Sequence, residues 1–350
     1  MSFDPNTLEL GLDTFGDITT DDAGVRLSQA QVIRNTVDEG ILADQVGVDY
    51  LGIGEHHRPD FAISNPEPIM TAILTQTRAI RVGTSVTVLS SDDPIRLFQR
   101  LSTINAMAGG RAEVTLGRGS FTESFPLFGF RLEDYETLFD EKFELFTQLV
   151  QTESISFQGK HRAALKNVTV YPRPETPIRT WRGVGGSPES VFSAAAHDLP
   201  LLIAIIGGNP SRFAPLVELY KRAHSQMGTT PKAVGVHSPG FVAETDDQAR
   251  EIYFDGYQKM HASIGASRGW PALRREDFLH EIEHGSLYVG SVETVAQKIA
   301  GTVATLGLQR FQLKYSSGPQ KASVLMRNIE LYGTQVIPRV REILGEIASI

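Results

Sequence analysis

Three consecutive residues that can exchange protons, Glu55, His56 and His57, directly follow the apolar run of residues 51–54. They fit four interpretations: metal ligands, an acid–base site, packed core histidines, or solvated residues at the end of a strand. Adjacent side chains on a strand face opposite ways, so His56 and His57 do not bind one metal unless the strand has ended. In a core, each polar group would need a partner. We therefore expect an acid–base site, with Glu55 and His57 facing one way and His56 the other.

A second motif, HEIEH at residues 280–284, matches the H-E-x-x-H pattern of zinc proteases. In a helix, His280 and His284 would share one face, and Glu281 would be the base. Gly285 follows at once, so we expect the pair in the last turn of a helix, where histidines suit the helix dipole. No third ligand follows at a zinc-site spacing. We predict no metal site.

Glycine and serine recur where apolar runs end, and a ligand can approach glycine backbone closely. Ordinary turns explain any one of these sites, but their repetition at one rim favours a large, flat ligand. Ser187 suits a helix N-cap and Pro188 the first helical position, so free N–H groups would face a phosphate there. Arg118 would supply the positive charge. The four sites are Gly117-Arg118-Gly119-Ser120, Gly185-Gly186-Ser187, Gly207-Gly208-Asn209 and Ser316-Ser317-Gly318.

The composition excludes several classes of function. The 350 residues contain no cysteine, which rules out thiolate chemistry and disulfides and fits a cytoplasmic protein. A formal charge of −8 without a basic block argues against nucleic acid and anionic membranes as partners. The start lacks a signal-peptide pattern, and the longest apolar run, 199–206, is too short to span a membrane. There is no G-x-S-x-G elbow and no G-x-G-x-x-G dinucleotide fingerprint.

Strand-like and helix-like segments alternate along the chain, which predicts a parallel sheet. Eight such units favour a (β/α)8 TIM barrel in a single domain, 1–350, with active-site residues at the carboxyl ends of the strands. Residues 155–174 are expected to form a β-hairpin excursion, and 261–289 an insertion after the seventh strand and a candidate lid. The strands are predicted at 8–16, 48–56, 80–89, 112–119, 179–186, 200–208, 233–243 and 310–318, and the helices at 29–45, 66–76, 94–107, 135–150, 188–196, 211–227, 246–260, 292–306 and 322–344.

Four segments, in order, resemble the bacterial luciferase-like family of flavin-dependent monooxygenases. They are GIGEHHRPDF, IRVGTSVTVLSSDDPIRLFQRLSTINAMAGGRAEVTLGRG, VGGSPESVFSAAAHDLPL and YVGSVETVAQKIAGTVATLGLQRFQL, and they span most of the chain. The resemblance implies a (β/α)8 barrel that binds reduced FMN or, in one branch, the deazaflavin F420. It also implies O2 and a small organic substrate, a separate flavin reductase, and a homodimer.

Site residues follow from the same resemblance. His56, beside Glu55, matches the family's catalytic histidine. Arg118, next to Gly119, matches the phosphate-binding arginine, and Ser187 and Ser190, after Gly185 and Gly186, match the phosphate hydroxyl positions. The family often has a cis peptide between two non-proline residues in the third strand, and the alignment places it at Ser85–Val86, against the flavin ring.

The chain also departs from the luciferases. Gly117 stands where they have a reactive thiol, and Gly186 where they have an acidic residue, so light emission and an aldehyde substrate are not expected. The leading hypothesis is an FMN-dependent monooxygenase. An F420-dependent dehydrogenase and a non-catalytic flavin-binding protein are the alternatives. Substrate choice is expected to depend on the segments 120–131 and 261–284.

Overall fold

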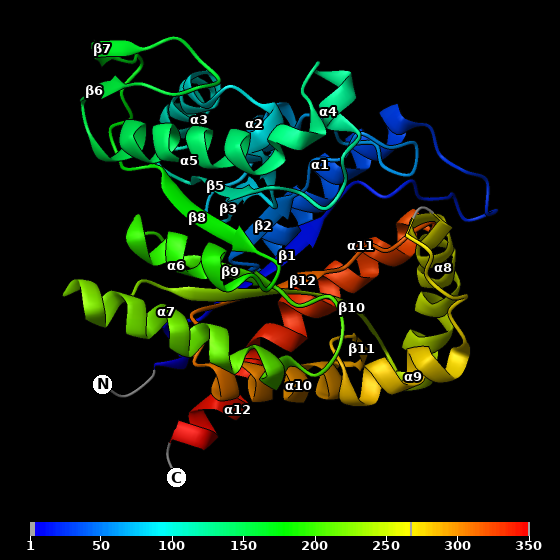
Figure 1. Cartoon of the computed structure of the whole chain (residues 1–350). Helices are drawn as coiled ribbons and strands as arrows, with labels where there is room; N and C mark the ends of the chain where they lie inside the picture. The colour runs from blue at the N-terminus through cyan, green and yellow to red at the C-terminus, as the bar shows by residue number, and fades with distance from the viewer. Residues whose placement is uncertain (1–3, 267, 349–350) are drawn as a thin grey trace.

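The computed structural model describes residues 4–266 and 268–348 and forms a closed barrel (Figure 1). Within these residues, eight parallel strands pair in order around the barrel, and β12 closes it by pairing with both β10 and β1. This confirms the predicted (β/α)8 fold. The strands are β1 (Glu9–Thr14), β2 (Tyr50–Ile53), β3 (Arg81–Thr84), β5 (Ala112–Gly117), β8 (Arg179–Val184), β9 (Leu201–Ala204), β10 (Val234–Ala243) and β12 (Arg310–Lys314).

Helices surround the barrel, and several begin where the sequence supplies a cap. Ser28, Asp93 and Ser187 each accept a hydrogen bond from a first-turn N–H, which satisfies a donor that the helix itself leaves free. These helices are α1 (Gln29–Gln45), α2 (Pro66–Leu74), α3 (Pro94–Met107), α5 (Tyr135–Gln151), α6 (Pro188–Ala196), α7 (Ala214–Met227), α10 (Val292–Leu306), α11 (Ala322–Leu331) and α12 (Ile337–Ala348). No helix in the described part of the chain is long and apolar enough to cross a membrane.

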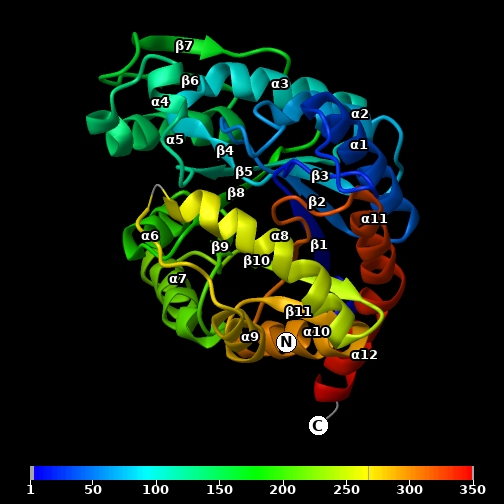
Figure 2. The same ribbon diagram turned by 90° about the vertical axis from the view of Figure 1, so that its right-hand side faces the viewer.

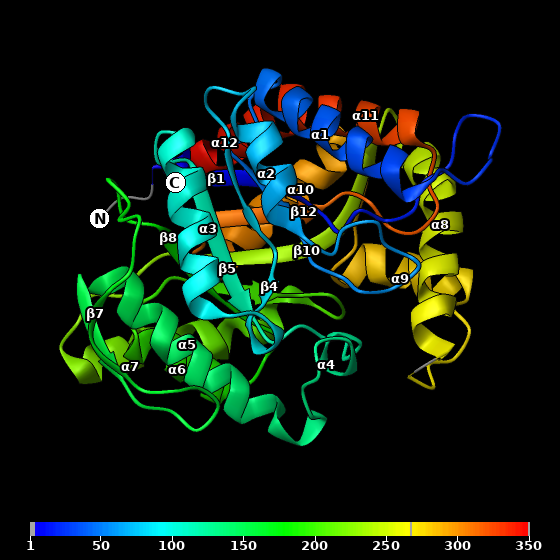
Figure 3. The same cartoon turned by 90° about the horizontal axis from the view of Figure 1, so that it is seen from above.

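Two additions decorate the barrel. β6 (Ser154–Phe157) and β7 (Leu165–Thr169) form an antiparallel pair between α5 and β8, where the sequence predicts a hairpin. After the seventh barrel strand, β10, the chain forms α8 (Asp246–Ala266), α9 (Arg275–His284) and β11 (Tyr288–Ser291). Figure 2 shows α8 crossing in front of the barrel. In Figure 3, α8, α9 and the short α4 (Ser124–Leu127) gather at one end of the barrel and both termini lie at the other.

Three predicted elements differ from the structure in their course, while the bounds of most others shift by up to four residues. The third strand is interrupted, because β3 stops at Thr84 and β4 (Thr87–Val88) resumes after the predicted cis peptide at Ser85–Val86. The helix expected at 246–260 continues to Ala266, because residues 261–266 contain no proline and keep helical spacing. The last helix, expected at 322–344, is interrupted by a π-helical turn at Tyr332–Val336.

Ion pairs fill the amino-terminal end of the barrel interior. Arg310 contacts Glu113 at 2.9 Å and also pairs with Glu9, while Arg179 lies 3.1 Å from Glu113. Burial alone would raise the pKa of Glu113, but Arg310 and its neighbours lower it to about 2. A buried pair of this kind destabilises the protein if one partner is lost. These charges are therefore structural. In such barrels, the active site lies at the opposite end, where the strands have their carboxyl ends.

Glu39, a buried residue on α1, should make the free energy of unfolding depend on pH. Its buried carboxyl accepts a hydrogen bond from Tyr315 Oη at 2.5 Å, and burial raises its pKa from 4.5 to about 7. A raised folded-state pKa stabilises the fold below about pH 4.5, and that contribution is lost as pH rises through 7. Glu39→Gln should remove this dependence, worth up to about 3 kcal/mol. Urea unfolding at pH 5 and pH 8 checks it, and an identical pH dependence in wild type and variant would contradict it.

Candidate functional site

The interrupted third strand places Val86 against Gly117 at the end of β5 and Gly183 in β8. A Cβ atom added to Gly117 would lie 2.6 Å from Val86 Cγ2, and one added to Gly183 would lie 3.0 Å from Val86 Cγ1. A side chain at Gly117 would therefore displace Val86, and one at Gly183 would crowd it. The structure confirms the predicted cis bond between Ser85 and Val86. It also supplies a steric reason for Gly117, where the resembling luciferases carry a thiol.

Glu55 and His57 face one way, as predicted. Glu55 Oε1 lies 2.9 Å from His57 Nε2, and Glu55 Oε2 accepts a hydrogen bond from the Val88 N–H at 2.9 Å. Burial raises the pKa of Glu55, while the hydrogen bonds from His57 and Val88 oppose that shift. Both carboxylate oxygens are engaged, so Glu55 connects the end of β2 to β4. Its contacts suit a residue that positions β4 through Val88, whereas the expected catalytic role stays a prediction.

His56 faces the other way and is enclosed by aromatic rings. Its imidazole centroid lies 4.5 Å from Phe15, 4.3 Å from Phe61 and 5.3 Å from Phe121. Burial, followed by the positive charge of Lys314, lowers its pKa to about 3. Its Nδ1 atom is buried without a hydrogen-bond partner. His56 is therefore a neutral imidazole at physiological pH, able to donate or accept one hydrogen bond to a bound molecule.

The predicted phosphate residues come together at the start of α6. Arg118 Nη2 donates to Ser190 Oγ at 2.7 Å, and Ser187 Oγ caps the helix by accepting from the Ser190 N–H at 3.3 Å. Gly186 has a φ of +123°, a conformation that favours glycine. Gly119 has a φ of +70° and accepts a hydrogen bond from a tyrosine hydroxyl through its carbonyl. A guanidinium, two hydroxyls and a helix N-terminus thus converge on one point.

Arg182 is a further cation at this point that the sequence analysis missed. Its side chain is buried and its Nη2 atom lies 3.4 Å from Ser190 Oγ. Its Nε atom has no partner, and no carboxylate of the described residues forms an ion pair with it. Burial, with Arg118 next, lowers its pKa to about 10. The sequence signal that was missed is the arginine within a strand predicted to be buried. A charged side chain is rarely buried unless it has a binding partner.

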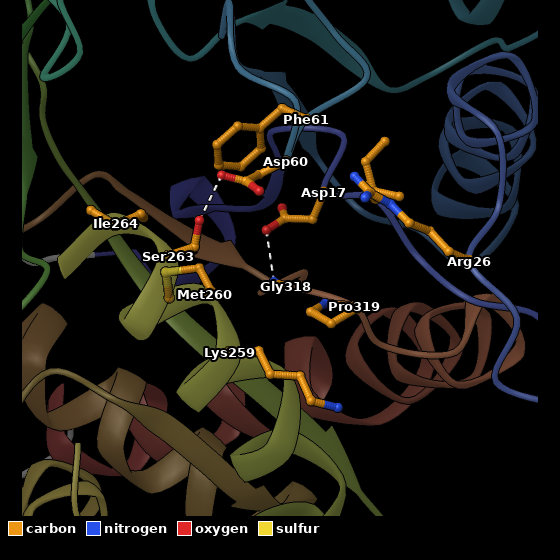
Figure 4. Close-up of a pocket in the computed structure, with 11 residues that line it drawn as sticks. Asp17, Arg26, Asp60, Phe61, Lys259, Met260, Ser263, Ile264, Gly318 and Pro319 are labelled. Atoms are coloured by element: carbon orange, nitrogen blue, oxygen red, sulfur yellow. Dashed lines mark hydrogen bonds between the residues drawn. The ribbon is translucent and has the colours of Figure 1, made fainter. Parts of the chain in front are cut away.

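A cavity of about 230 Å³ opens beside the aromatic cluster (Figure 4). Phe61 lies between it and His56, and Met260 and Ser263 of α8 form another wall. Asp60 accepts from Ser263 Oγ at 2.9 Å, and Asp17 accepts from the Gly318 N–H at 2.8 Å, as the dashed lines in Figure 4 mark. The cavity is therefore one aromatic ring away from His56.

The two segments expected to shape the substrate site meet near the same cluster. Arg268 Nη2 donates to the Ser120 carbonyl at 2.8 Å, and the Arg268 guanidinium lies 5.0 Å from the Phe121 ring centroid. Arg58 covers the same ring at 4.8 Å. Charged guanidinium groups over an aromatic face are favourable contacts. They join the segment after α8 to the segment after β5, although the effect on substrate choice stays a prediction.

The HEIEH motif forms hydrogen bonds that connect α9 to neighbouring segments of the chain. It ends α9, as expected, with Gly285 directly after the last turn. Glu281 accepts hydrogen bonds from the backbone N–H groups of Gly208 at 3.1 Å and Ser286 at 3.2 Å. The described residues contain no group of three histidine or acidic side chains that could hold a metal ion. The carboxylate thus connects α9 to the segment after β9.

Comparisons with known proteins show the family to which the chain belongs. The family model for luciferase-like monooxygenases matches residues 14–310. An alkanal monooxygenase alpha chain from the Kryptophanaron alfredi symbiont is 23% identical, covering 91% of this chain and 95% of that protein.

Solved structures share the fold. One is the oxygenating constituent of 3,6-diketocamphane monooxygenase from Pseudomonas putida in complex with FMN, with a TM-score of 0.77, 19% identity and coverage of 95% of this chain and 99% of that chain. An F420-dependent secondary alcohol dehydrogenase has a TM-score of 0.72 and 17% identity, with the same two coverages. The comparisons therefore include both flavin and deazaflavin proteins.

Proposed function

This chain belongs to the luciferase-like monooxygenase family, and we propose that it uses reduced FMN and O2 to oxygenate a small organic molecule. The observation that carries the proposal is the pair of guanidinium groups at the start of α6. Arg118 and Arg182 both lie within hydrogen-bond distance of Ser190 Oγ, and Arg182 has no carboxylate partner among the described residues. A buried cation without an ion-pair partner is costly, and within the described part of the chain only the more distant charge of Asp140 offsets that cost. The phosphate of FMN would supply the missing negative charge.

The residues of the site fit the rest of that cofactor. When bound, reduced FMN supplies two electrons to O2 and thereby an oxygen atom for the substrate. Arg118, Ser187 and Ser190 would hold its phosphate, with Gly119, Gly185 and Gly186 allowing close backbone approach. Ser85 and Val86 would support the face of the ring. His56, kept neutral by its aromatic enclosure, would hold or move one proton at the reacting centre.

An F420-dependent dehydrogenase is the second candidate, because an F420 enzyme shares the fold. F420 carries a polyglutamate tail, and this acidic chain, with a formal charge of −8, has no basic block to bind it. We therefore favour FMN. A separate flavin reductase, a homodimer and a cytoplasmic location stay proposals, since they follow from the family resemblance and from the absence of cysteine.

Cofactor choice can be tested by titrating the purified protein separately with FMN, reduced FMN and F420 and recording absorbance and fluorescence. We expect saturable binding of reduced FMN and of FMN, and weaker binding of F420. Tighter binding of F420 than of either form of FMN would support the dehydrogenase instead. Binding of FMN without O2-dependent oxidation of any added organic compound would favour a non-catalytic flavin-binding protein.

A further inference from the structure

A second histidine lies inside the barrel and is paired with a carboxylate. His237 on β10 lies 2.5 Å from Asp13 of β1, measured from Nδ1 to Oδ2. Asp13 is fully buried, and 8% of the His237 side chain is exposed. The strand register sets Asp13 beside Lys314 and His237 beside Gln312, both on β12. The pair therefore spans the interior surface of three adjacent strands.

The barrel is built to leave room for this pair. A Cβ atom added to Gly52 would lie only 1.8 Å from Asp13 Oδ1, so any side chain there would displace the carboxylate. Asp13 Oδ1 itself has no hydrogen-bond partner. The carboxylate is thus positioned by the space that Gly52 leaves and by its contact with His237. A glycine at this inward position keeps the pair together.

His237 and His56 border the same aromatic side chain. The Phe15 ring is stacked on His237 at 5.7 Å with an interplanar angle of 13°, and it lies 4.5 Å from His56. The two histidines nevertheless have different surroundings. His56 is enclosed by phenylalanines and Nδ1 has no partner, whereas His237 has a carboxylate on Nδ1. Nε2 of His237 has no hydrogen-bond partner within residues 4–266 and 268–348.

A carboxylate on Nδ1 fixes the tautomer of an imidazole and stabilises the cation that forms when Nε2 takes a proton. When two titratable groups in one site have such different surroundings, they take different roles in proton transfer. His56 is suited to act as a neutral hydrogen-bond partner. His237 is suited to remove a proton.

We propose that His237, oriented by Asp13, is the general base of the reaction and that the substrate is an aromatic compound with an acidic hydroxyl, a phenol. This inference rests on the proposed monooxygenase function. The substrate O–H bond breaks, its proton moves to His237 Nε2, and the electron pair stays on oxygen, which makes the ring more electron-rich. With two electrons and two protons from reduced FMN, O2 would give one oxygen atom to a ring carbon, where a C–O bond replaces the C–H bond, and the other oxygen atom to water. The proton leaves His237 for solvent as the product is released.

The surroundings match a phenolate. Phe15 borders both histidines, Phe61 and Phe121 pack beside His56, and aromatic rings favour one another as neighbours. Lys314 Nζ lies 4.6 Å from the Phe15 ring centroid and pairs with Asp17 at 3.0 Å, so these two residues add no net charge beside the histidines. Proton removal therefore depends on the Asp13–His237 pair itself.

The test uses p-nitrophenol, whose ionised form is yellow, mixed with the FMN-loaded protein at a pH below the probe's own pKa. We expect the wild-type protein to bind the probe in its yellow form. His237→Gln and Asp13→Asn should bind it mainly as the colourless phenol, with the ionised fraction reduced about tenfold or more. His224→Gln, which replaces another buried histidine on α7, is the matched control and should behave as wild type. Gly52→Ala should resemble Asp13→Asn.

Three outcomes would overturn the proposal: no binding of p-nitrophenol, binding of the colourless form by wild type, or undiminished yellow colour in His237→Gln. If the variants do not fold, ¹⁵N-histidine spectra of the wild-type protein decide the matter. Adding the probe should convert one histidine from the Nδ1–H tautomer to the doubly protonated form, and no change would overturn the proposal. FMN affinity of the wild-type protein is measured separately. If the proposed function is wrong, the protein does not bind FMN. If only the role of His237 is wrong, FMN binds and the probe gives one of the contradicting results.

Discussion

Replacing His56 by alanine is expected to reduce turnover by about a hundredfold to ten-thousandfold, the usual contribution of a proton-transfer residue. FMN affinity should change little, because the phosphate residues lie at the start of α6, on a different part of the rim. The reason for the large loss is that Phe15, Phe61 and Phe121 surround the imidazole with apolar rings, and alanine offers no hydrogen-bonding group in its place. Rates of product formation and FMN titrations, measured on the same preparations, check the prediction.

His284→Ala is the control for this variant. His284 is an exposed histidine at the end of α9 and belongs to the HEIEH motif. Its replacement should leave turnover unchanged. Turnover of His56→Ala within about threefold of wild type would remove His56 from the mechanism. Loss of activity in His284→Ala, restored by added zinc, would instead revive the metal interpretation.

Arg118→Ala should weaken FMN binding about tenfold to a hundredfold, because a charged hydrogen bond to phosphate is worth about 1.5–3 kcal/mol. Riboflavin, which lacks the phosphate, should bind the variant and the wild type equally. Arg182→Ala should weaken FMN similarly, and the double variant should show less than the sum of the two losses, since both cations contact Ser190.

Arg34→Ala is the matched control for the arginine variants. Arg34 is exposed on α1, a different helix from α6, and donates a hydrogen bond to Gln31 Oε1 at 2.7 Å. Its FMN affinity should equal that of wild type. Equal FMN affinity in wild type and Arg118→Ala would exclude Arg118 from the binding site. A parallel loss of riboflavin affinity would show that the substitution disturbs the barrel and not the phosphate contact.

Much of this site could be predicted because its signals are local in the chain. The Glu55-His56-His57 run predicted that the two histidines face opposite ways, because successive side chains of a strand alternate between its two faces. Ser187 and Pro188 gave the start of α6 through capping chemistry alone. The alternation of elements gave the barrel and the insertion after the seventh strand.

The residues that were missed depend on contacts that only the folded chain makes. Arg182 lies inside β8 and contacts Ser190 because β8 turns directly into α6, and the sequence alone does not show which way its side chain faces. The Asp13–His237 pair joins residues 224 positions apart, and a single sequence gives no register for β1 and β10. At the interruption, residues 332–336, Gly333 lies against Val46, a contact between distant segments that helical periodicity does not encode.

A crystal structure of the FMN complex tests the central claim most directly. The account predicts the phosphate within hydrogen-bond distance of Arg118, Ser187 and Ser190, with the flavin ring against Val86 and its reactive edge toward His56. Release of the Arg118–Ser190 hydrogen bond in favour of phosphate would be the accompanying change. A phosphate bound elsewhere on the rim, or a ring that does not contact Val86, would contradict it.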